Sequence, residues 1–155
     1  MGEPSQNVIL PFESYPHHGR VLLGSVGGDN CRRGYGLQFM QRTGQTRCAY
    51  CGVDFTASYE IWLTMALDHV VPASVGKGMC IPLEWTEDCA SKVLACAACN
   101  SFHNRYKPPS SILCPKNLEE FFNLRDAIFL ERKGLIAARH ISEREFFEQS
   151  KWKTK

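Results

Sequence analysis

The amino-acid sequence predicts an α+β fold: a small two-stranded core braced by a four-cysteine zinc site and followed by a C-terminal helical arm. Three observations predict it. Cysteines occur twice in the spacing Cys-X-X-Cys, and two short strand-like segments lie between the pairs. After residue 117, apolar residues recur with a period of about 3.6 residues, as in a helix. With 155 residues, the chain is long enough for one domain with a modest core.

The composition is that of a globular protein, with 44% hydrophobic and 22% charged residues, which excludes wholesale disorder. The longest apolar run, 93–99, is far shorter than the ~20 residues that span a bilayer. Glu3 and Pro4 stand where a signal peptide has lysines and a long apolar stretch. We therefore expect a soluble, cytoplasmic protein with no membrane partner.

The expected elements follow in chain order: an irregular segment with a basic stretch over 1–47, a strand within 59–71, a long loop over 72–90, a second strand over 92–95 and a helix from 97 to about 105. β-Branched and aromatic residues support the first strand, and Pro72 stops it. Pro108 and Pro109 break the helix.

Residues 108–155 are expected to form a linker and a C-terminal helical extension. Asn117 and Glu120 fit a capping box at its start. Ser142 begins a second capping signal, which predicts a separate last helix over 143–150. We expect the apolar face of the extension to pack on the core. A DNA-backbone arm, or a homodimer formed through this helix, stays open.

The two cysteine pairs predict a structural Zn²⁺ ion held by Cys48, Cys51, Cys96 and Cys99. Two residues between the ligands of each pair let both sulfurs face one point, and Zn²⁺ favours four thiolates at tetrahedral corners. The absence of a secretory signal argues against a disulfide scaffold. The remaining cysteines are expected to be small buried side chains: Cys31, Cys80, Cys89 and Cys114.

Between the cysteine pairs lies Asp68-His69-Val70-Val71-Pro72, and Asn100 follows the second pair directly. A cysteine pair, then Asp-His-Val-Val-Pro, then a cysteine pair followed by Asn resembles the HNH endonucleases with a ββα-metal core, most closely their zinc-stabilised branch. The resemblance covers residues 48–107. It implies that this segment is a nuclease core and that the protein is a metal-dependent endonuclease whose partner is DNA.

The chemistry of these residues agrees with that reading. A histidine that titrates near neutrality can take a proton from water, so His69 is the expected general base. Carboxylate and amide oxygens are hard ligands, so Asp68 and Asn100 are expected to bind a catalytic Mg²⁺ or Mn²⁺. Neighbouring strand residues point to opposite faces, so Asp68 and His69 converge only if the strand ends or bulges there. Taken singly, each has a plain structural reading as a turn, strand-end or helix-cap residue.

Ser91 departs from the family pattern, in which an asparagine begins the second strand and braces the loop that holds the histidine. A serine hydroxyl lacks the paired donor and acceptor of an amide. This leaves an alternative open: a catalytically weak or inactive, zinc-stabilised nucleic-acid-binding module. A zinc-braced protein-interaction domain that uses the C-terminal helix is a third reading.

The remaining candidates are less specific. His103 can share a helical face with Asn100 and is a second-rank metal ligand. Basic stretches at 31–47 and 99–116 contain no acidic residue, although the net charge is only +2. The expected phosphate contacts within them are Arg42, Arg47, Arg105 and Lys107. The histidines without a supporting context are read as surface: His17, His18 and His140.

Overall fold

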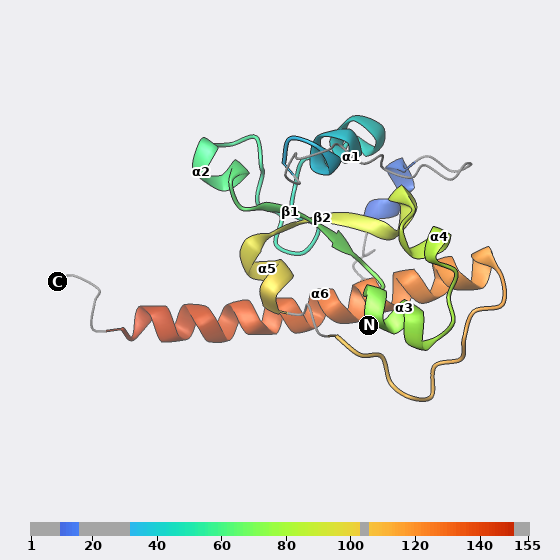
Figure 1. The fold of residues 1–155 in the computed structure, drawn as a ribbon. Coiled ribbons are helices and arrows are strands. Elements are labelled where there is room, and N and C mark those ends of the chain that lie inside the picture. Colours follow the sequence, from blue (N-terminus) through green and yellow to red (C-terminus); the bar gives the residue numbers. More distant parts are fainter. Residues whose placement is uncertain (1–9, 16–31, 103–105, 151–155) are drawn as a thin grey trace, which may run out of the picture.

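The computed structural model describes residues 10–15, 32–102 and 106–150. Its described elements show the α+β fold that the sequence predicts (Figure 1). In chain order they are the 3-10 helix η1 (Pro11–Ser14), helices α1 (Tyr35–Thr43) and α2 (Tyr59–Trp62), strand β1 (Met65–His69), helices α3 (Ala73–Gly78) and α4 (Leu83–Thr86), the 3-10 helix η2 (Cys89–Ser91), strand β2 (Lys92–Cys96), and helices α5 (Ala97–Phe102) and α6 (Leu118–Glu148).

The two strands pair antiparallel in an unbroken register from Met65 opposite Cys96 to His69 opposite Lys92. All five residues of β2 are buried, as expected for a strand covered on both faces. The predicted strand over 92–95 is thus confirmed, with one more residue. β2 runs directly into α5, so the second cysteine pair sits where the strand becomes a helix.

Helix α6 runs along one side of the molecule and covers the core beneath the strands and α5 (Figure 1). Its buried residues recur three and four apart, which places them on one face: Phe121, Leu124, Arg125, Ile128, Phe129, Arg132 and Ile136. The Phe129 ring packs edge-on against Phe12 and stacks on Tyr50. From 141 to 149 every residue is exposed, so the last part of the helix projects beyond the core.

The predicted start of this helix is confirmed, because Asn117 Oδ1 accepts a hydrogen bond from the Glu120 amide at 2.9 Å. The Glu120 carboxylate reaches back to the Lys116 amide at 2.7 Å. The separate last helix over 143–150 is wrong, because α6 continues unbroken through Ser142 to Glu148. An ion pair between Arg139 and Glu143, at 2.8 Å, supports the helix across that point.

Two further expectations need correction, and a third is confirmed. The segment 1–47 is not irregular throughout, since α1 forms there and packs Phe39 into the core. The strand expected within 59–71 is confirmed as β1, which begins at Met65. Before this strand, Ser58 Oγ accepts a hydrogen bond from the Ile61 amide at 3.1 Å and caps the start of the short helix α2. The long loop over 72–90 contains the short helices α3 and α4.

The unpaired cysteines divide by burial. Cys89 is fully buried, as expected, whereas Cys80 and Cys114 are exposed. Cys80 also has a positive φ of 53°, which places it in a turn after α3. Cys31 lies outside the described residues.

No helix in the described ranges combines the length and the apolar character that crossing a membrane requires.

Candidate metal centre and adjoining pocket

The four cysteines of the two pairs meet in one cluster. The sulfurs of Cys48, Cys51, Cys96 and Cys99 all lie within 4.8 Å of one another. The Cys51 and Cys96 sulfurs are 3.8 Å apart. Sulfurs placed about 2.3 Å from one zinc ion at tetrahedral corners lie about 3.8 Å from each other, so this donor set and its spacing fit Zn²⁺.

Each pair is shaped by its local backbone. In the first pair, the Gly52 amide closes a turn onto the Cys48 carbonyl at 2.9 Å, and Gly52 adopts the positive φ of 79° that glycine tolerates. The Cys96 amide lies 3.4 Å from the Cys48 sulfur, and the Cys99 amide lies 3.5 Å from the Cys96 sulfur. Amide groups aimed at sulfur favour the thiolate form that a metal needs.

The cysteine thiols of the cluster differ in pKa. Hydrogen bonds from Cys96 and Cys99 outweigh burial and hold the pKa of Cys48 well below its usual value. Hydrogen bonds with Cys48 and Cys96, together with burial, raise the pKa of Cys99 far above its usual value. Burial raises the pKa of Cys51 to about 11. Zinc must therefore displace protons from the cluster, so its affinity falls as the pH falls.

Helix α6 contributes a neighbour to this cluster. His140 Nε2 lies 3.0 Å from the Cys99 sulfur, and its ring packs edge-on against Phe102 at 5.0 Å. The expectation that His140 is surface without a role is therefore wrong. The sequence held a signal, because His140 follows the buried residues Arg132 and Ile136 at spacings of four and so shares their face.

A pocket of about 160 Å³ lies where β1 ends. It is lined by Leu67, Asp68, His69, Pro72, Ala73, Asn100 and Arg132. The pocket brings together the Asp, His and Asn that the sequence singled out, two from β1 and one from α5. Because β1 ends at His69 without a bulge, both side chains reach the pocket from the end of the strand.

Asp68 is buried and held by two partners. Its Oδ2 accepts a hydrogen bond from the Tyr50 hydroxyl at 2.7 Å and another from Arg132 Nη1 at 2.8 Å. Its Oδ1 has one longer contact, with Arg132 Nη2 at 3.3 Å. Burial, followed by the nearby Asp68 charge, raises the pKa of Tyr50 far above its usual value, so this hydroxyl remains a donor.

His69 is paired with the carboxylate of Glu87, the residue that follows α4. Its Nε2 lies 2.8 Å from Glu87 Oε1, and the other Glu87 oxygen accepts from Lys92 at 3.2 Å. Burial acts to raise the pKa of Glu87, but the hydrogen bond and charge of His69, together with Lys92, hold it below its usual value. An ionised carboxylate can only accept, so Nε2 carries the proton. In the neutral ring, the lone pair is then at Nδ1.

Sequence reasoning missed three residues around the pocket. Glu87 lies in a segment without periodicity, and no pattern marks it as a partner of His69. Tyr50 lies inside the first cysteine pair, where the metal spacing draws attention to the thiols alone. Arg132 carried a signal, because a charged residue at an apolar position of a helix is an exception that needs a partner.

The other predicted residues lie elsewhere. His103 and Arg105 fall outside the described residues. Arg47 donates to the Gly52 carbonyl at 3.1 Å and forms an ion pair with Asp54 at 3.5 Å, so it is engaged within the first cysteine turn. Arg42 is exposed in the last turn of α1. Lys107 is exposed and borders a second pocket, of about 390 Å³, beside α3.

Ser91 is buried, and its hydroxyl donates to the Trp85 carbonyl at 2.5 Å. The Ser91 side chain thus forms its hydrogen bond within the segment that precedes β2. Only its backbone carbonyl reaches the residue after His69, accepting from the Val70 amide at 3.0 Å.

No family model, curated protein or solved structure was found to match this chain.

The cluster predicts one zinc ion per chain. Replacing Cys96→Ala should remove the zinc and lower the melting temperature, because a structural zinc site contributes folding free energy directly. Cys89→Ala is the matched control, since this cysteine is also buried but lies outside the cluster. Elemental analysis and thermal unfolding measure both effects. Equal zinc contents in the two variants would refute the assignment.

The contact of His140 with Cys99 predicts slower zinc release than the cysteines alone would give. His140→Phe keeps the aromatic contact with Phe102 but removes the hydrogen bond between Nε2 and the Cys99 sulfur. Zinc transfer to a chromogenic chelator should become about 10-fold faster, since groups that hydrogen-bond metal ligands typically contribute 10–100-fold to affinity. An unchanged transfer rate would mean that the contact does not act on the metal.

Proposed function

We propose that this protein is a metal-dependent endonuclease that hydrolyses phosphodiester bonds of DNA, the activity that its resemblance to the HNH endonucleases implies. One observation carries the proposal. A single polar pocket is lined by Asp68, His69 and Asn100, the residue types that metal-assisted hydrolysis requires. The pocket and the cysteine cluster share α5, which contains both Asn100 and Cys99.

The pocket fits a small hard cation. Mg²⁺ typically keeps several waters and takes one or two carboxylates from the protein. Asp68 Oδ1 has a single long contact, so it retains acceptor capacity, and Asn100 adds an amide oxygen. The positive charge of Arg132 repels a metal ion bound nearby. We therefore expect the pocket to bind Mg²⁺ or Mn²⁺ weakly when no phosphate is present. When bound, Mg²⁺ or Mn²⁺ would stabilise negative charge on the phosphate and on the departing oxygen.

His69 would act as the general base. Glu87 holds its Nε2 proton, so the ring presents Nδ1 as the atom that accepts a proton from water. Lys92 contacts the same carboxylate and helps to keep it ionised. The imidazole is 32% exposed, which leaves it accessible to water and to a substrate.

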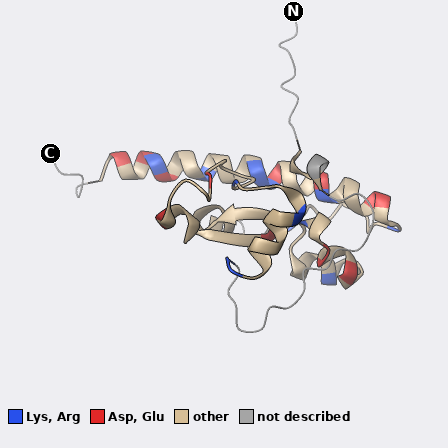
Figure 2. Ribbon diagram, turned by 90° about the horizontal axis from the view of Figure 1, so that it is seen from above, with Lys and Arg blue, Asp and Glu red and all other residues tan. Residues whose placement is uncertain are grey.

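DNA would approach through basic residues outside the pocket. Arg42 and Lys107 are exposed and remain candidates for phosphate contacts, together with Arg47 and Arg105. Basic and acidic residues alternate along α6 (Figure 2), so this helix offers no continuous basic surface for a DNA backbone.

A second candidate function is a nucleic-acid-binding module without nuclease activity. One observation favours it: the polar groups that catalysis needs are already engaged, Asp68 by Arg132 and His69 by Glu87. A binding module would keep the same cysteine cluster and basic residues but would need neither a base nor a hard metal.

The two functions predict different results for His69→Ala. For the nuclease, Mg²⁺- or Mn²⁺-dependent cutting of supercoiled plasmid should fall by about 10²–10⁴-fold, the usual contribution of proton transfer. Zinc content, melting temperature and DNA affinity should be unchanged, because the side chain is partly exposed and lies outside the cysteine cluster.

Glu87→Gln is the matched companion variant, because it keeps the size of the side chain and removes its charge. It should cut more slowly than the wild type but faster than His69→Ala. A wild-type cutting rate in His69→Ala would refute the assignment of the base. Metal-independent binding without any cutting by the wild type would favour the second function.

A further inference from the structure

Arg132 is the most deeply buried charged side chain in the described part of the protein, and it comes from outside the segment that resembles a nuclease core. It is 0% exposed and lies in the middle of α6. Besides the Asp68 carboxylate, its Nη1 group donates to the carbonyls of His69 at 2.9 Å and Val70 at 3.0 Å. One guanidinium thus binds three consecutive residues.

Those three residues form the end of β1 and the first residue beyond it. Past His69 the register with β2 stops, and one further bond, from the Val70 amide to the Ser91 carbonyl, continues the pairing. The Ser91 hydroxyl is turned to Trp85 and adds nothing there. Of the two side chains, Ser91 and Arg132, it is therefore Arg132 that holds the end of β1.

We propose that Arg132 is a positioning residue that holds the end of β1 so that Asp68 and His69 both face the pocket; this rests on the nuclease activity proposed above. Because Nη1 and Nη2 divide between the two carboxylate oxygens, the carboxylate is fixed in one rotation, with Oδ2 saturated and Oδ1 available. The bond to the His69 carbonyl fixes the backbone from which the imidazole projects.

Arginine suits this position better than lysine. A planar guanidinium presents donors from two nitrogens in a fixed fork: Nη1 contacts Asp68 Oδ2 and the two carbonyls, and Nη2 contacts Asp68 Oδ1. A lysine ammonium would keep the charge and the ion pair, but its single nitrogen could not contact both carboxylate oxygens in a fork while also bonding the two carbonyls. Tyr50, whose ring lies 5.3 Å from the guanidinium carbon, adds a cation–π contact.

The helix supplies a matched control. Arg125 lies seven residues earlier on the same helix and is also buried, at 7% exposure. It donates to the Ala90 carbonyl at 2.7 Å and forms an ion pair with Asp126, and it does not line the pocket. Removing either arginine leaves a carbonyl and a carboxylate without that donor, so both variants should lose stability. Arg132 contacts the end of β1 directly, whereas Arg125 reaches only Ala90, next to the Ser91 acceptor of the Val70 amide, so Arg132→Met should have the larger effect there.

The first test needs no activity. The exchange of the Val70 amide hydrogen is measured in Arg132→Met and in Arg125→Met, each at the temperature that gives the two variants the same free energy of unfolding. We expect the exchange to be at least 10-fold faster in Arg132→Met. Arg132→Lys should lie between the wild type and Arg132→Met. Equal exchange of Val70 in the two Met variants would overturn the proposal. If Arg132→Met does not fold, Val70 exchange is compared between Arg132→Lys and Arg125→Lys. Faster exchange in Arg132→Lys supports the proposal, and equal exchange overturns it.

The second test separates positioning from mere stability. With plasmid as substrate, Arg132→Met should lower the maximal cutting rate at least 10-fold. The Mn²⁺ concentration for half-maximal rate should not rise, because removing a cation beside Asp68 favours metal binding. A simple loss of folded protein would lower the rate equally in Arg125→Met. Faster cutting by Arg132→Met would show that Arg132 inhibits the site and would overturn the proposal.

The two tests also separate this proposal from the proposed function. If the wild type does not cut DNA but Val70 exchange responds as expected, the nuclease assignment fails and the structural role of Arg132 stands. If the wild type cuts and neither the exchange nor the rate responds to Arg132, the nuclease assignment stands and the positioning role fails.

Discussion

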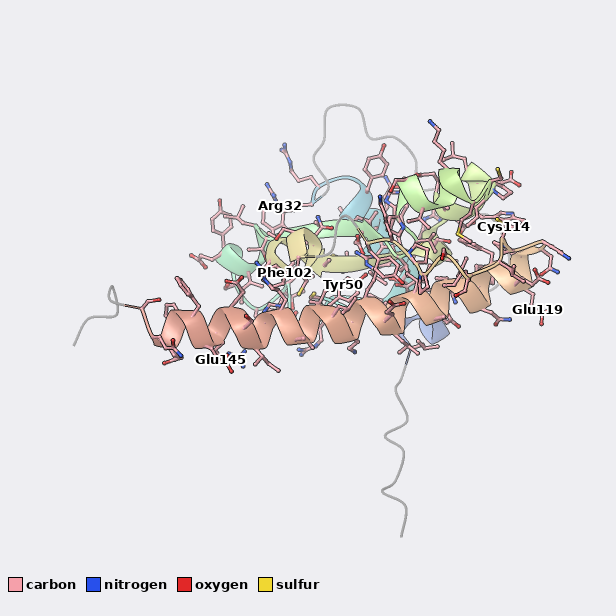
Figure 3. All side chains as sticks on the ribbon, turned by 90° about the horizontal axis from the view of Figure 1, so that it is seen from below. Arg32, Tyr50, Phe102, Cys114, Glu119 and Glu145 are labelled. Atoms are coloured by element: carbon pink, nitrogen blue, oxygen red, sulfur yellow. The ribbon has the colours of Figure 1, made fainter. Side chains whose placement is uncertain are left out.

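The buried ion pair between Asp68 and Arg132 is the interaction on which the rest of the structure depends. It joins the end of β1 to the middle of α6, two segments that are distant in the sequence. Breaking a buried ion pair by removing one partner typically costs about 3–5 kcal/mol, because the other charge is left uncompensated. Tyr50 bonds the same carboxylate from within the first cysteine turn, so strand, helix and cysteine cluster meet at one side chain. Figure 3 shows Tyr50 over the middle of α6, with Glu119 and Glu145 near the two ends of the helix.

Helix α6 connects the pocket with the cysteine cluster. Arg132 contacts Asp68, Ile136 packs in the core, and His140 contacts Cys99, each about one turn further along the same face. Polar contacts at both Arg132 and His140 fix the register of α6, so the cysteine cluster and the pocket keep a defined relation to each other.

The local features were predictable from the sequence. The cysteine cluster follows from the spacing of two pairs, and the Asn117 cap and the strand over 92–95 follow from short-range patterns. The grouping of Asp68, His69 and Asn100 around one pocket agrees with the order of motifs along the chain.

Other features depend on contacts between distant segments, which a sequence pattern does not encode. Glu87, which follows α4, meets His69 at the end of β1 only through the tertiary fold, and no periodicity marks that carboxylate. Helix α1 was missed because Phe39 is buried by its tertiary neighbours, although its surroundings in the sequence are rich in glycine and polar residues. The break expected at Ser142 did not occur, because serine is tolerated within a helix where nothing else ends it.

The central claim is that Asp68 stays tied to Arg132 while its other oxygen serves a metal. Anomalous diffraction from a crystal of the wild-type protein soaked in Mn²⁺ tests this most directly, because zinc and manganese are distinguished at their absorption edges. The account predicts a zinc peak among the four cysteine sulfurs and a manganese peak beside Asp68 and Asn100, with the Asp68–Arg132 pair intact. A manganese peak elsewhere, an empty pocket in the soaked crystal, or an Asp68 side chain turned away from Arg132 would contradict it.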